Sequence, residues 1–359
     1  MKKFNNFFKI NKTKVGLNYP TYFIADIAAN HDGKLSKALK LIELAAKNGA
    51  QAAKFQHFAA ETIVSDYEFK NFRSKLSHQS KWKKSVYQVY KNASVPLSWT
   101  RALVSKCKEC KIDFFSAVYD LNYVDKLNKH MHAYKVGSGD LTWDEMLSKI
   151  AKKKKPIIIA TGASEAKEVE HAVKTLNTNN KNICIMQCNT NYTADEKNFK
   201  NINLNVLNFY KKKFPNIVLG LSDHTKGYAT VLGAITMGVR VVEKHFTDNN
   251  NLNGPDHLFS MNPKDWKEMI IASRQLENSF GDGIKRVEKN EMQTVIIQRR
   301  AVCASSFIEK NSRIKKKNLI CLRPSPKRSI QPKDINKIIG KITKKNFQKG
   351  QCIYWKDLK

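Results

Sequence analysis

The sequence predicts a (β/α)₈ barrel followed by a small, mainly β domain. Eight short apolar runs alternate with segments of helical periodicity, the runs end in polar residues or glycine, and the pattern changes near residue 288. The runs are rich in Ile, Val and Phe at nearly every position, which is typical of parallel strands covered on both faces. Eight such strands favour a closed barrel over a doubly wound open sheet. The expected strands are Phe23–Ala29, Ala52–Phe58, Asp113–Tyr119, Ala133–Gly139, Pro156–Gly162, Ile183–Asn189, Ile217–Asp223 and Val239–Phe246.

The segments between these runs have the spacing of amphipathic helices. In Ser36–Asn48, the side chains of Leu39 and Ile42 share one stripe. Ser36 is suited to cap the start of this helix, and Gly49 is suited to end it. No G-x-G-x-x-G motif follows the first strand, so nothing indicates a dinucleotide site. The other expected helices are Thr142–Lys154, Glu165–Leu176, Glu196–Phe214, Gly227–Met237 and Pro263–Phe280.

The connection after the second strand, about residues 59–112, is much longer than the others. It contains a polar and aromatic stretch, Tyr67–Trp82, and a helical pattern near Leu97–Lys111. Long connections on this side of a barrel usually shape the mouth of the active site, so we expect that role here.

The last part of the chain has a different pattern. Glu288–Arg300 is expected to be a connecting helix, and Ala301–Lys359 contains three short strand-like pieces and several prolines. We therefore expect a barrel domain at 1–285, a linker at 286–300 and a mainly β domain at 301–359. The strand-like pieces are Ala301–Ser305, Leu319–Leu322 and Gln351–Trp355.

The formal net charge of +33 raises the question of whether the basic residues are concentrated in one region or dispersed. Most of the basic residues are Lys, spread along almost every expected helix, whereas a nucleic-acid binder concentrates its charge in a patch or stripe. We therefore expect no nucleic-acid partner, although the field would attract an anionic substrate. The apolar runs are too short for a membrane span, and the first residues have no apolar signal-peptide core, so a cytoplasmic protein is expected. The seven scattered cysteines do not indicate a disulfide framework.

Active sites of such barrels lie at the carboxyl ends of the strands. His224 and His245 end two consecutive strands, so we expect them side by side, where two imidazoles suit a divalent cation of the Mn²⁺, Fe²⁺ or Zn²⁺ kind. Charged residues inside apolar strands need a partner or a function. Lys54 and Lys135, with nearby serine hydroxyls, suggest a cradle for phosphate or carboxylate. The strand ends of interest include Asp26, Lys54, Gln56, Lys135, Ser138, Asn191, Tyr192, Ser222, His224, Glu243 and His245.

Several segments together resemble the sialic acid synthase family, which includes the synthases for N-acetylneuraminate, legionaminate and pseudaminate. The resemblance covers nearly the whole chain, and its last part is similar to the family's antifreeze-like (SAF) domain. The barrel segments are FIADIAANHDGKLSKALKLIELAAKNGAQAAKFQHF (23–58), YKVGSGD (134–140), ATGAS (160–164), LGLSDHTKGY (219–228), EKHFT (243–247) and GPDHLFSMNP (254–263). The SAF segments are LRPSP (322–326), IIGK (338–341) and KGQCIYWKDL (349–358).

The resemblance implies an enzyme that condenses phosphoenolpyruvate with an open-chain N-acetylated amino sugar and water, releasing phosphate by C–O cleavage. The acceptor would be N-acetylmannosamine or a 6-deoxy diacetamido hexose. It also implies a homodimer in which Arg323 of one SAF domain reaches the partner's barrel. The implied roles are metal binding by His224 and His245, with Mn²⁺ preferred over Mg²⁺ or Co²⁺; catalysis by these two and by Asp26 and Glu243; phosphoenolpyruvate binding by Lys54, Lys135, Ser138, Thr190, Asn191 and Ser222; and sugar binding by Gln56, Tyr192, Asp256 and Arg323.

The chain departs from the family pattern at four places. Asp26 and Asp140 stand where glutamates are usual, and Ala117 stands where a threonine is usual. Thr190 occupies the position of an asparagine, which Asn189 or Asn191 would have to replace. Two alternatives remain at this point. One is a related barrel synthase of the 3-deoxy-octulosonate-phosphate type, disfavoured because no Arg lies between 102 and 239 to bind a second phosphate. The other is a basic, nonenzymatic polyanion-binding protein.

Overall fold

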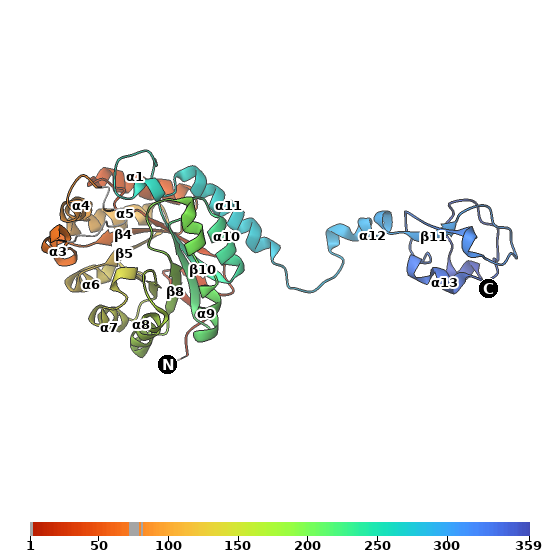
Figure 1. Ribbon diagram of the computed structural model, residues 1–359, viewed down its shortest axis with the longest axis horizontal. Coiled ribbons are helices and arrows are strands. Elements are labelled where there is room, and N and C mark those ends of the chain that lie inside the picture. The colour runs from red at the N-terminus through yellow and green to blue at the C-terminus, as the bar shows by residue number, and fades with distance from the viewer. Residues whose placement is uncertain (1–2, 72–78, 80–81) are drawn as a thin grey trace. The chain divides into compact units, whose positions relative to one another are not determined.

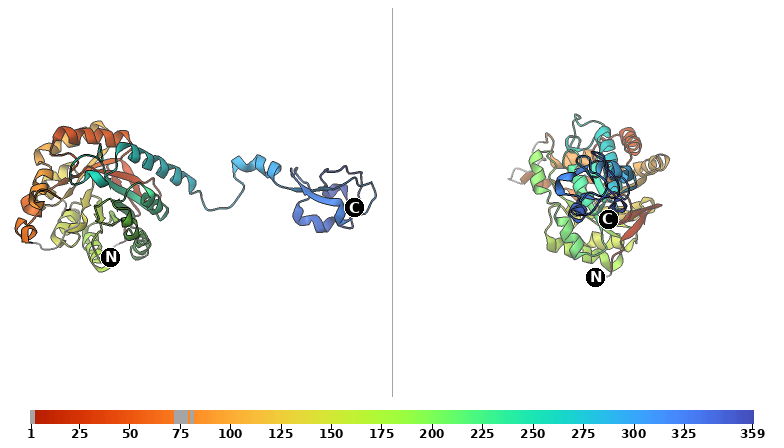
Figure 2. Two further views of the ribbon diagram at one scale, coloured as in Figure 1. Left: turned by 45° about the horizontal axis from the view of Figure 1, so that its top comes forward. Right: turned by 90° about the vertical axis from the view of Figure 1, so that its right-hand side faces the viewer.

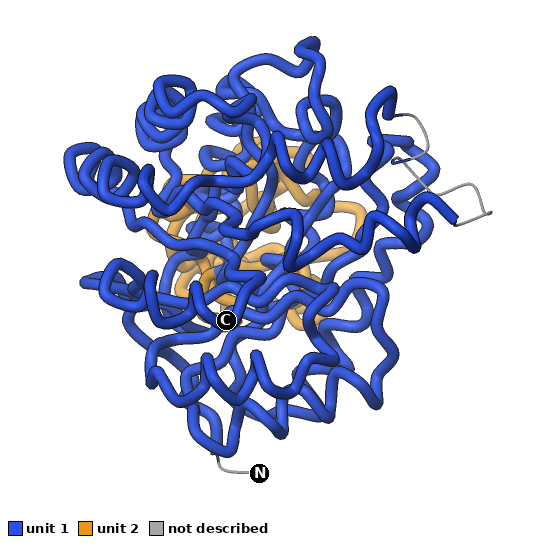
Figure 3. Tube along the Cα trace, turned by 90° about the vertical axis from the view of Figure 1, so that its left-hand side faces the viewer, with its two compact units in different colours: residues 1–280 blue, residues 281–359 orange. Residues whose placement is uncertain are grey.

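The computed structural model describes residues 3–71, 79 and 82–359, and the chain divides into two compact units, residues 1–280 and 281–359 (Figure 3). Each unit has its own cluster of buried hydrophobic side chains. The division falls after Phe280, a few residues before the boundary expected at 285.

The first unit is a closed barrel of eight parallel strands, which confirms the predicted fold (Figure 1). Each strand pairs with its neighbour in chain order, and β10 closes the barrel against β3. Nearly every strand residue is buried, because the inner face is packed and helices cover the outer face. The strands are β3 (Tyr22–Asp26), β4 (Ala52–His57), β5 (Asp113–Val118), β6 (Tyr134–Val136), β7 (Ile157–Ala160), β8 (Ile183–Cys188), β9 (Val218–Asp223) and β10 (Val239–His245).

Helices surround the strands, as the left view of Figure 2 shows. Their buried side chains recur at helical spacing, as in α1, where Ala38, Leu41, Ile42 and Ala45 face the barrel. The helices are α1 (Leu35–Lys47), α2 (Ala60–Ile63), α3 (Asp66–Asn71), α4 (Val86–Ala93), α5 (Thr100–Glu109), α6 (Leu121–Leu127), α7 (Asp144–Lys152), α8 (Ala166–Asn179), α9 (Val206–Lys213), α10 (Ala229–Thr236) and α11 (Pro263–Ser279).

Two local predictions are wrong. Ser36 does not cap α1, since the helix begins at Leu35 with Lys34 in the cap position and no side-chain cap. The expected helix Glu196–Phe214 is a 3₁₀ helix at Glu196–Asn201 and then α9. Asn203, with a φ of +49°, interrupts it, because Asn tolerates the left-handed region that a continuous helix excludes.

Sequence reasoning also missed a hairpin before the barrel. Strands β1 (Phe7–Ile10) and β2 (Thr13–Gly16) pair antiparallel, with Phe8, Ile10 and Val15 buried. Strand β2 contacts β9 and β10, so the hairpin packs against the barrel strands. Its four-residue strands are too short for a periodicity signal.

In its described residues, the long connection after β4 forms the helices α2 to α5. Of the aromatic stretch Tyr67–Trp82, residues 72–78 and 80–81 lie outside the described part of the chain. The helix expected at Leu97–Lys111 is a 3₁₀ turn at Leu97–Trp99 followed by α5.

The second unit contains α12 (Met292–Gln298), β11 (Ala301–Ala304), β12 (Leu319–Leu322) and α13 (Ile335–Ile338). Strands β11 and β12 pair antiparallel over a small core that includes Val302, Ile330 and Phe347. The expected strand Gln351–Trp355 forms only isolated bridges, at Cys352 and Tyr354. In the part of the chain that is described, none of the helices has both the length and the apolar content needed to cross a membrane.

Candidate active site

Strand alternation decides which polar residues enter the barrel. Side chains two apart in a strand point to the same face. On β10, Glu243 and His245 therefore point inward while Lys244 between them points outward. On β4, Lys54 and Gln56 share the inner face. Together with Asp26, Lys135, Ser138, Thr190, Tyr192, Ser222 and His224, these residues line a cavity of about 440 Å³.

Two lysines and two carboxylates form the buried centre of this cavity. The Lys54 ammonium lies 2.8 Å from Asp26 and 3.4 Å from Glu243, and Lys135 also lies 3.4 Å from Glu243. Ser222 donates a hydrogen bond to Glu243, and the Gln56 amide donates one to Asp26. All four side chains are almost fully buried.

The same environment separates the two carboxylates in pKa. Burial would raise the pKa of Glu243, but Lys135 and Lys54 hold it down at about 2. Burial raises the pKa of Asp26 above its ordinary value and outweighs the opposing effect of Lys54. Glu243 is thus suited to stay ionised, and Asp26, whose pKa is raised, takes up a proton more readily than Glu243, an arrangement that fits acid and base roles in one site.

His224 and His245 lie side by side, as expected, with ring centroids 5.3 Å apart. Burial lowers the pKa of both imidazoles to about 3. The neighbouring His245 adds to this effect for His224, and Lys54 adds to it for His245, so both rings are neutral. His224 Nδ1 is 2.8 Å from the carbonyl oxygen of Asn189 and donates to it, which leaves Nε2 with a free lone pair. His245 Nδ1 is buried and has no hydrogen-bond partner among the described residues.

The imidazole nitrogens of His224 and His245 fit a divalent cation whose other coordination positions stay open to water and substrate. In residues 3–71, 79 and 82–359, no three His, Cys, Asp or Glu side chains gather into a metal-binding cluster. The protein would therefore supply two imidazole nitrogens, and water and substrate oxygens would complete the shell.

Ser138 and Thr190 bring two hydroxyls close to Gly162 in the cavity lining. The Gly162 amide donates to Ser138 Oγ at 2.9 Å. A Cβ on Gly162 would lie 2.5 Å from Thr190, 3.0 Å from Ser138 and 3.2 Å from Cys188, so only glycine allows this close approach. Ser138 and Thr190 are thereby held at the same edge as Lys135.

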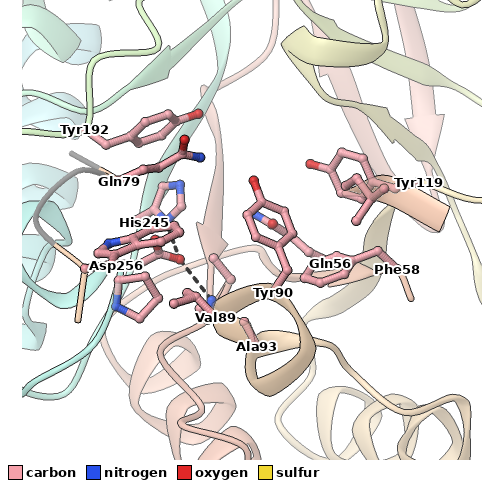
Figure 4. A pocket seen from close by; sticks show the side chains of 15 residues that line it. Gln56, Phe58, Gln79, Val89, Tyr90, Ala93, Tyr119, Tyr192, His245 and Asp256 are labelled. Carbon is pink, nitrogen blue, oxygen red and sulfur yellow. Dashed lines mark hydrogen bonds and ion pairs between the residues drawn. The ribbon is translucent and has the colours of Figure 1, made fainter. Parts of the chain in front are cut away.

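A second cavity of about 200 Å³ adjoins the first and shares Gln56, Tyr192 and His245 with it (Figure 4). Asp256 lies at its edge and accepts a hydrogen bond from the Ala29 amide at 3.0 Å. Ala28, with a φ of +43°, turns the chain after β3 so that this amide reaches Asp256. Burial raises the pKa of Asp256 to about 6.

Asn191 and Lys244 lie outside the two cavities. The side-chain oxygen of Asn191 accepts hydrogen bonds from Thr193 and Asn198. Lys244, also a charge within an apolar strand, points out of the barrel and pairs with Asp223. Arg323 belongs to the second unit, on β12's carboxyl side.

Sequence reasoning missed several lining residues. Tyr90 and Tyr119 line both cavities, and Phe58 and Val89 line the smaller one. Tyr119 directly follows β5, so the rule that active-site residues lie at the carboxyl ends of barrel strands could have identified it. Val89 and Tyr90 come from α4, within the long connection, where sequence offered no signal for individual residues.

Known proteins with similar sequences span the same length. The chain is 35% identical to the N,N'-diacetyllegionaminic acid synthase of Campylobacter jejuni, over 93% of this chain and 98% of that one. It is 31% identical to the N,N'-diacetyllegionaminic acid synthase of Legionella pneumophila, over 98% of both chains. Among solved structures, the spore coat polysaccharide biosynthesis protein SpsE of Bacillus subtilis superposes with a TM-score of 0.64, at 27% identity, over 98% of this chain and 99% of that one.

Two family models match the chain in the order of its units. The model of the NeuB family matches residues 41–285, which hold most of the barrel and the strand ends that build the site. The model of the SAF domain matches residues 299–359 in the second unit. The chain therefore belongs to the NeuB family, the sialic acid synthase family that its sequence motifs resemble, and it carries a SAF domain.

Proposed function

We propose that this protein condenses phosphoenolpyruvate with an open-chain N-acetylated amino sugar and water, giving a nonulosonic acid and inorganic phosphate. One observation carries the proposal most strongly. Two lysines, two carboxylates with separated pKa values and two neutral histidines converge in one buried cavity. Relatives named as legionaminic acid synthases support the same type of reaction.

Charge balance supports a cation as part of the site. Lys54 and Lys135 are matched by Glu243 and, when it is ionised, by Asp26, so the cluster has at most one surplus positive charge for the multiply charged phosphoenolpyruvate. Burying such an anion without compensation would be costly. Mn²⁺ held by His224 and His245 would supply the missing charge, with Mg²⁺ or Co²⁺ as substitutes. Bound there, the ion would act as a Lewis acid on the aldehyde oxygen of the sugar.

The two carboxylates suit the proton transfers of this reaction. Carbon 3 of phosphoenolpyruvate attacks the aldehyde carbon, and the oxygen of the aldehyde takes the proton held by Asp26. Water adds to carbon 2 and gives a proton to Glu243. The C–O bond to phosphate then breaks, the new hydroxyl returns its proton to Asp26 as the ketone forms, and phosphate leaves with the proton from Glu243.

The remaining residues position the substrates. Lys54, Lys135, Ser138, Thr190 and Ser222 line the side on which phosphate and carboxylate would bind, and they stabilise charge throughout. Gln56, Tyr192 and Asp256 line the side on which the sugar would bind. We also propose a homodimer in which the partner's Arg323 completes the sugar site.

The test is phosphate release from phosphoenolpyruvate with Mn²⁺ and a panel of 2-acetamido sugars. In H₂¹⁸O, the label should enter the keto acid and not the phosphate, because C–O cleavage leaves the bridging oxygen on phosphorus. His245→Gln should lose both activity and Mn²⁺ binding by calorimetry while its circular dichroism spectrum is retained. Release only with arabinose 5-phosphate or erythrose 4-phosphate would favour a related barrel synthase, and no release with any sugar would refute the proposal.

A further inference from the structure

Cys303 and Cys352 lie opposite each other in the second unit, although they are 49 residues apart in the chain. They form an isolated antiparallel bridge. Backbone hydrogen bonds flank this bridge, since the Ile353 amide donates to the Val302 carbonyl on one side and a matching bond lies on the other. The two cysteines are therefore a non-hydrogen-bonded pair, the kind whose Cα atoms lie closest in a sheet, at about 4.5 Å.

The side chains of these two cysteines point toward each other. Both are free thiols, and their sulfur atoms lie 3.2 Å apart. The Cα atoms of a disulfide are usually about 4.4–6.8 Å apart, so this position in the sheet accepts a disulfide without movement of the backbone. All seven cysteines lie in the described residues, and among them this is the pair joined by a hydrogen bond between sulfur atoms.

The two thiols differ in their access to solvent. Cys352 is half-buried, whereas Cys303 is only 1% exposed. Burial and the neighbouring Cys352 raise the pKa of the Cys303 thiol to about 12, so it stays protonated. Cys352 is therefore the thiol that a dissolved oxidant meets first, and Cys303 is placed to react with the product. This is the arrangement of an attacking and a resolving cysteine.

We propose that Cys303 and Cys352 form a reversible disulfide, a modification site in the SAF domain that does not depend on the proposed catalytic function. The oxidant is a low-molecular-weight disulfide such as glutathione disulfide. The Cys352 sulfur attacks one sulfur of the oxidant, and glutathione leaves with the proton of Cys352. The Cys303 sulfur then attacks the Cys352 sulfur, and the second glutathione leaves with the proton of Cys303. Two protein thiols are oxidised, and one glutathione disulfide is reduced to two thiols.

The cross-link constrains the second unit. It closes a loop between residues that are 49 apart, which removes conformational entropy from the opened chain. It also removes two thiol hydrogen bonds, from Cys303 to the Ala301 carbonyl at 3.6 Å and from Cys352 to the Pro324 carbonyl at 3.8 Å. Because thiols are weak donors, the constraint outweighs the loss of these bonds. Oxidation should therefore make opening of the SAF domain rarer.

The first experiment maps the modification in the full-length protein. The protein is incubated with glutathione disulfide, the remaining thiols are alkylated, and its tryptic peptides are identified by mass spectrometry. We expect one linked pair of peptides, joined through Cys303 and Cys352, which dithiothreitol separates. A stable glutathione adduct on Cys352, a link from either residue to Cys321, or two unmodified thiols would each overturn the proposal.

Three variants test the order of the two steps. Cys303→Ser should retain glutathione on Cys352, because the second step is blocked, and Cys352→Ser should leave Cys303 unmodified. Cys321→Ser is the matched control, since Cys321 lies in β12 of the same unit and is also half-buried, and it should form the cross-link as the wild type does. Circular dichroism checks that each variant folds. Loss of the cross-link in Cys321→Ser, or glutathione on Cys303 in Cys352→Ser, would contradict the assignment.

The second experiment measures the constraint. Amide hydrogen exchange of the oxidised and the reduced full-length protein is followed in urea by mass spectrometry. Peptides from residues 301–359 should exchange about tenfold or more slowly in the oxidised protein, because the cross-linked domain opens less often. Peptides from the barrel should exchange at the same rate in both forms and are the internal control. Equal exchange of residues 301–359 in the two forms would overturn the inferred constraint.

Discussion

Lys244 donates a hydrogen bond to Asp223 across the neighbouring strands β10 and β9, with 2.5 Å between Nζ and Oδ2. The two residues are partners in the strand register, and both side chains are almost fully buried on the outside of the barrel. Each is followed in its strand direction by one of the paired histidines, His245 or His224. The ion pair therefore fixes the two strand ends relative to each other at the point where the histidines must meet.

Lys244→Met should destabilise the protein by about 3–5 kcal/mol, because it leaves the carboxylate of Asp223 buried without its cation. Thr225 and Thr230 also donate to Asp223, but they carry no charge to balance it. Urea denaturation measures the difference. Lys70→Met is the matched control, since Lys70 forms an exposed ion pair with Asp66 and should change stability little. Similar losses in the two variants would contradict the structural role given to Lys244.

Sequence reasoning identified the inward residues well because two simple rules determine them. Catalytic groups lie at the carboxyl ends of barrel strands, and alternation places every second side chain inside. Lys244 shows the limit of the first rule applied alone, since a charge in an apolar strand can serve an ion pair on the outer face. Alternation from Glu243 and His245 would have placed it outside.

Residues from connections were harder to predict. Val89 and Tyr90 depend on how α4 packs over the barrel mouth, which no local pattern encodes. Thr190 and Asn191 are consecutive residues after β8, yet their roles differ. Thr190 lines the cavity, whereas Asn191 is used within its own turn. Short-range hydrogen bonding of Asn to nearby backbone competes with any role toward a ligand.

Gly162→Ala should impair the use of phosphoenolpyruvate. Its methyl group would lie 2.5 Å from Thr190, so Thr190 or Ser138 would have to move by about 1 Å. A displacement of that size typically costs about 10²-fold in rate. We expect most of the loss in kcat/KM for phosphoenolpyruvate and little change in the KM of the sugar. Gly233→Ala is the control, because Gly233 lies in α10, lines neither cavity, and its added methyl group would lie 3.1 Å from the flexible side chain of Leu204. A loss confined to the sugar would contradict the assignment of this edge to phosphoenolpyruvate.

Stability should fall in acid because of His57. This buried ring lies 2.8 Å from Ser116 and 3.2 Å from Thr100, and burial lowers its pKa to about 4, compared with 6.5 in an unfolded chain. The unfolded state therefore takes up the proton first, and stability that is present above pH 6.5 is lost as the pH falls toward 4. Between pH 7 and pH 5 the loss from this residue should be about 2 kcal/mol.

Two variants separate titration of the ring from loss of its contacts. His57→Asn should have a shallower dependence of unfolding free energy on pH between 7 and 5. Thr100→Val removes one hydrogen bond to His57 but keeps the ring, so it should lower stability by about 1 kcal/mol at all pH values and keep the slope. A wild-type slope in His57→Asn would show that the acid sensitivity arises elsewhere.

Arg323 gives a test of the proposed homodimer. Arg323→Ala should raise the KM of the sugar more than that of phosphoenolpyruvate, because its proposed contact is with the sugar alone. His245→Gln should be inactive through its own barrel. If Arg323 acts across the dimer, a mixed dimer of the two variants contains one complete site, formed by the barrel of the Arg323→Ala subunit and the SAF domain of the other. Mixing the two variants under conditions that exchange subunits should then restore a low sugar KM in part of the population. Each variant incubated alone is the control. A mixture that behaves as the sum of its two components would place Arg323 in the site of its own subunit or outside any site.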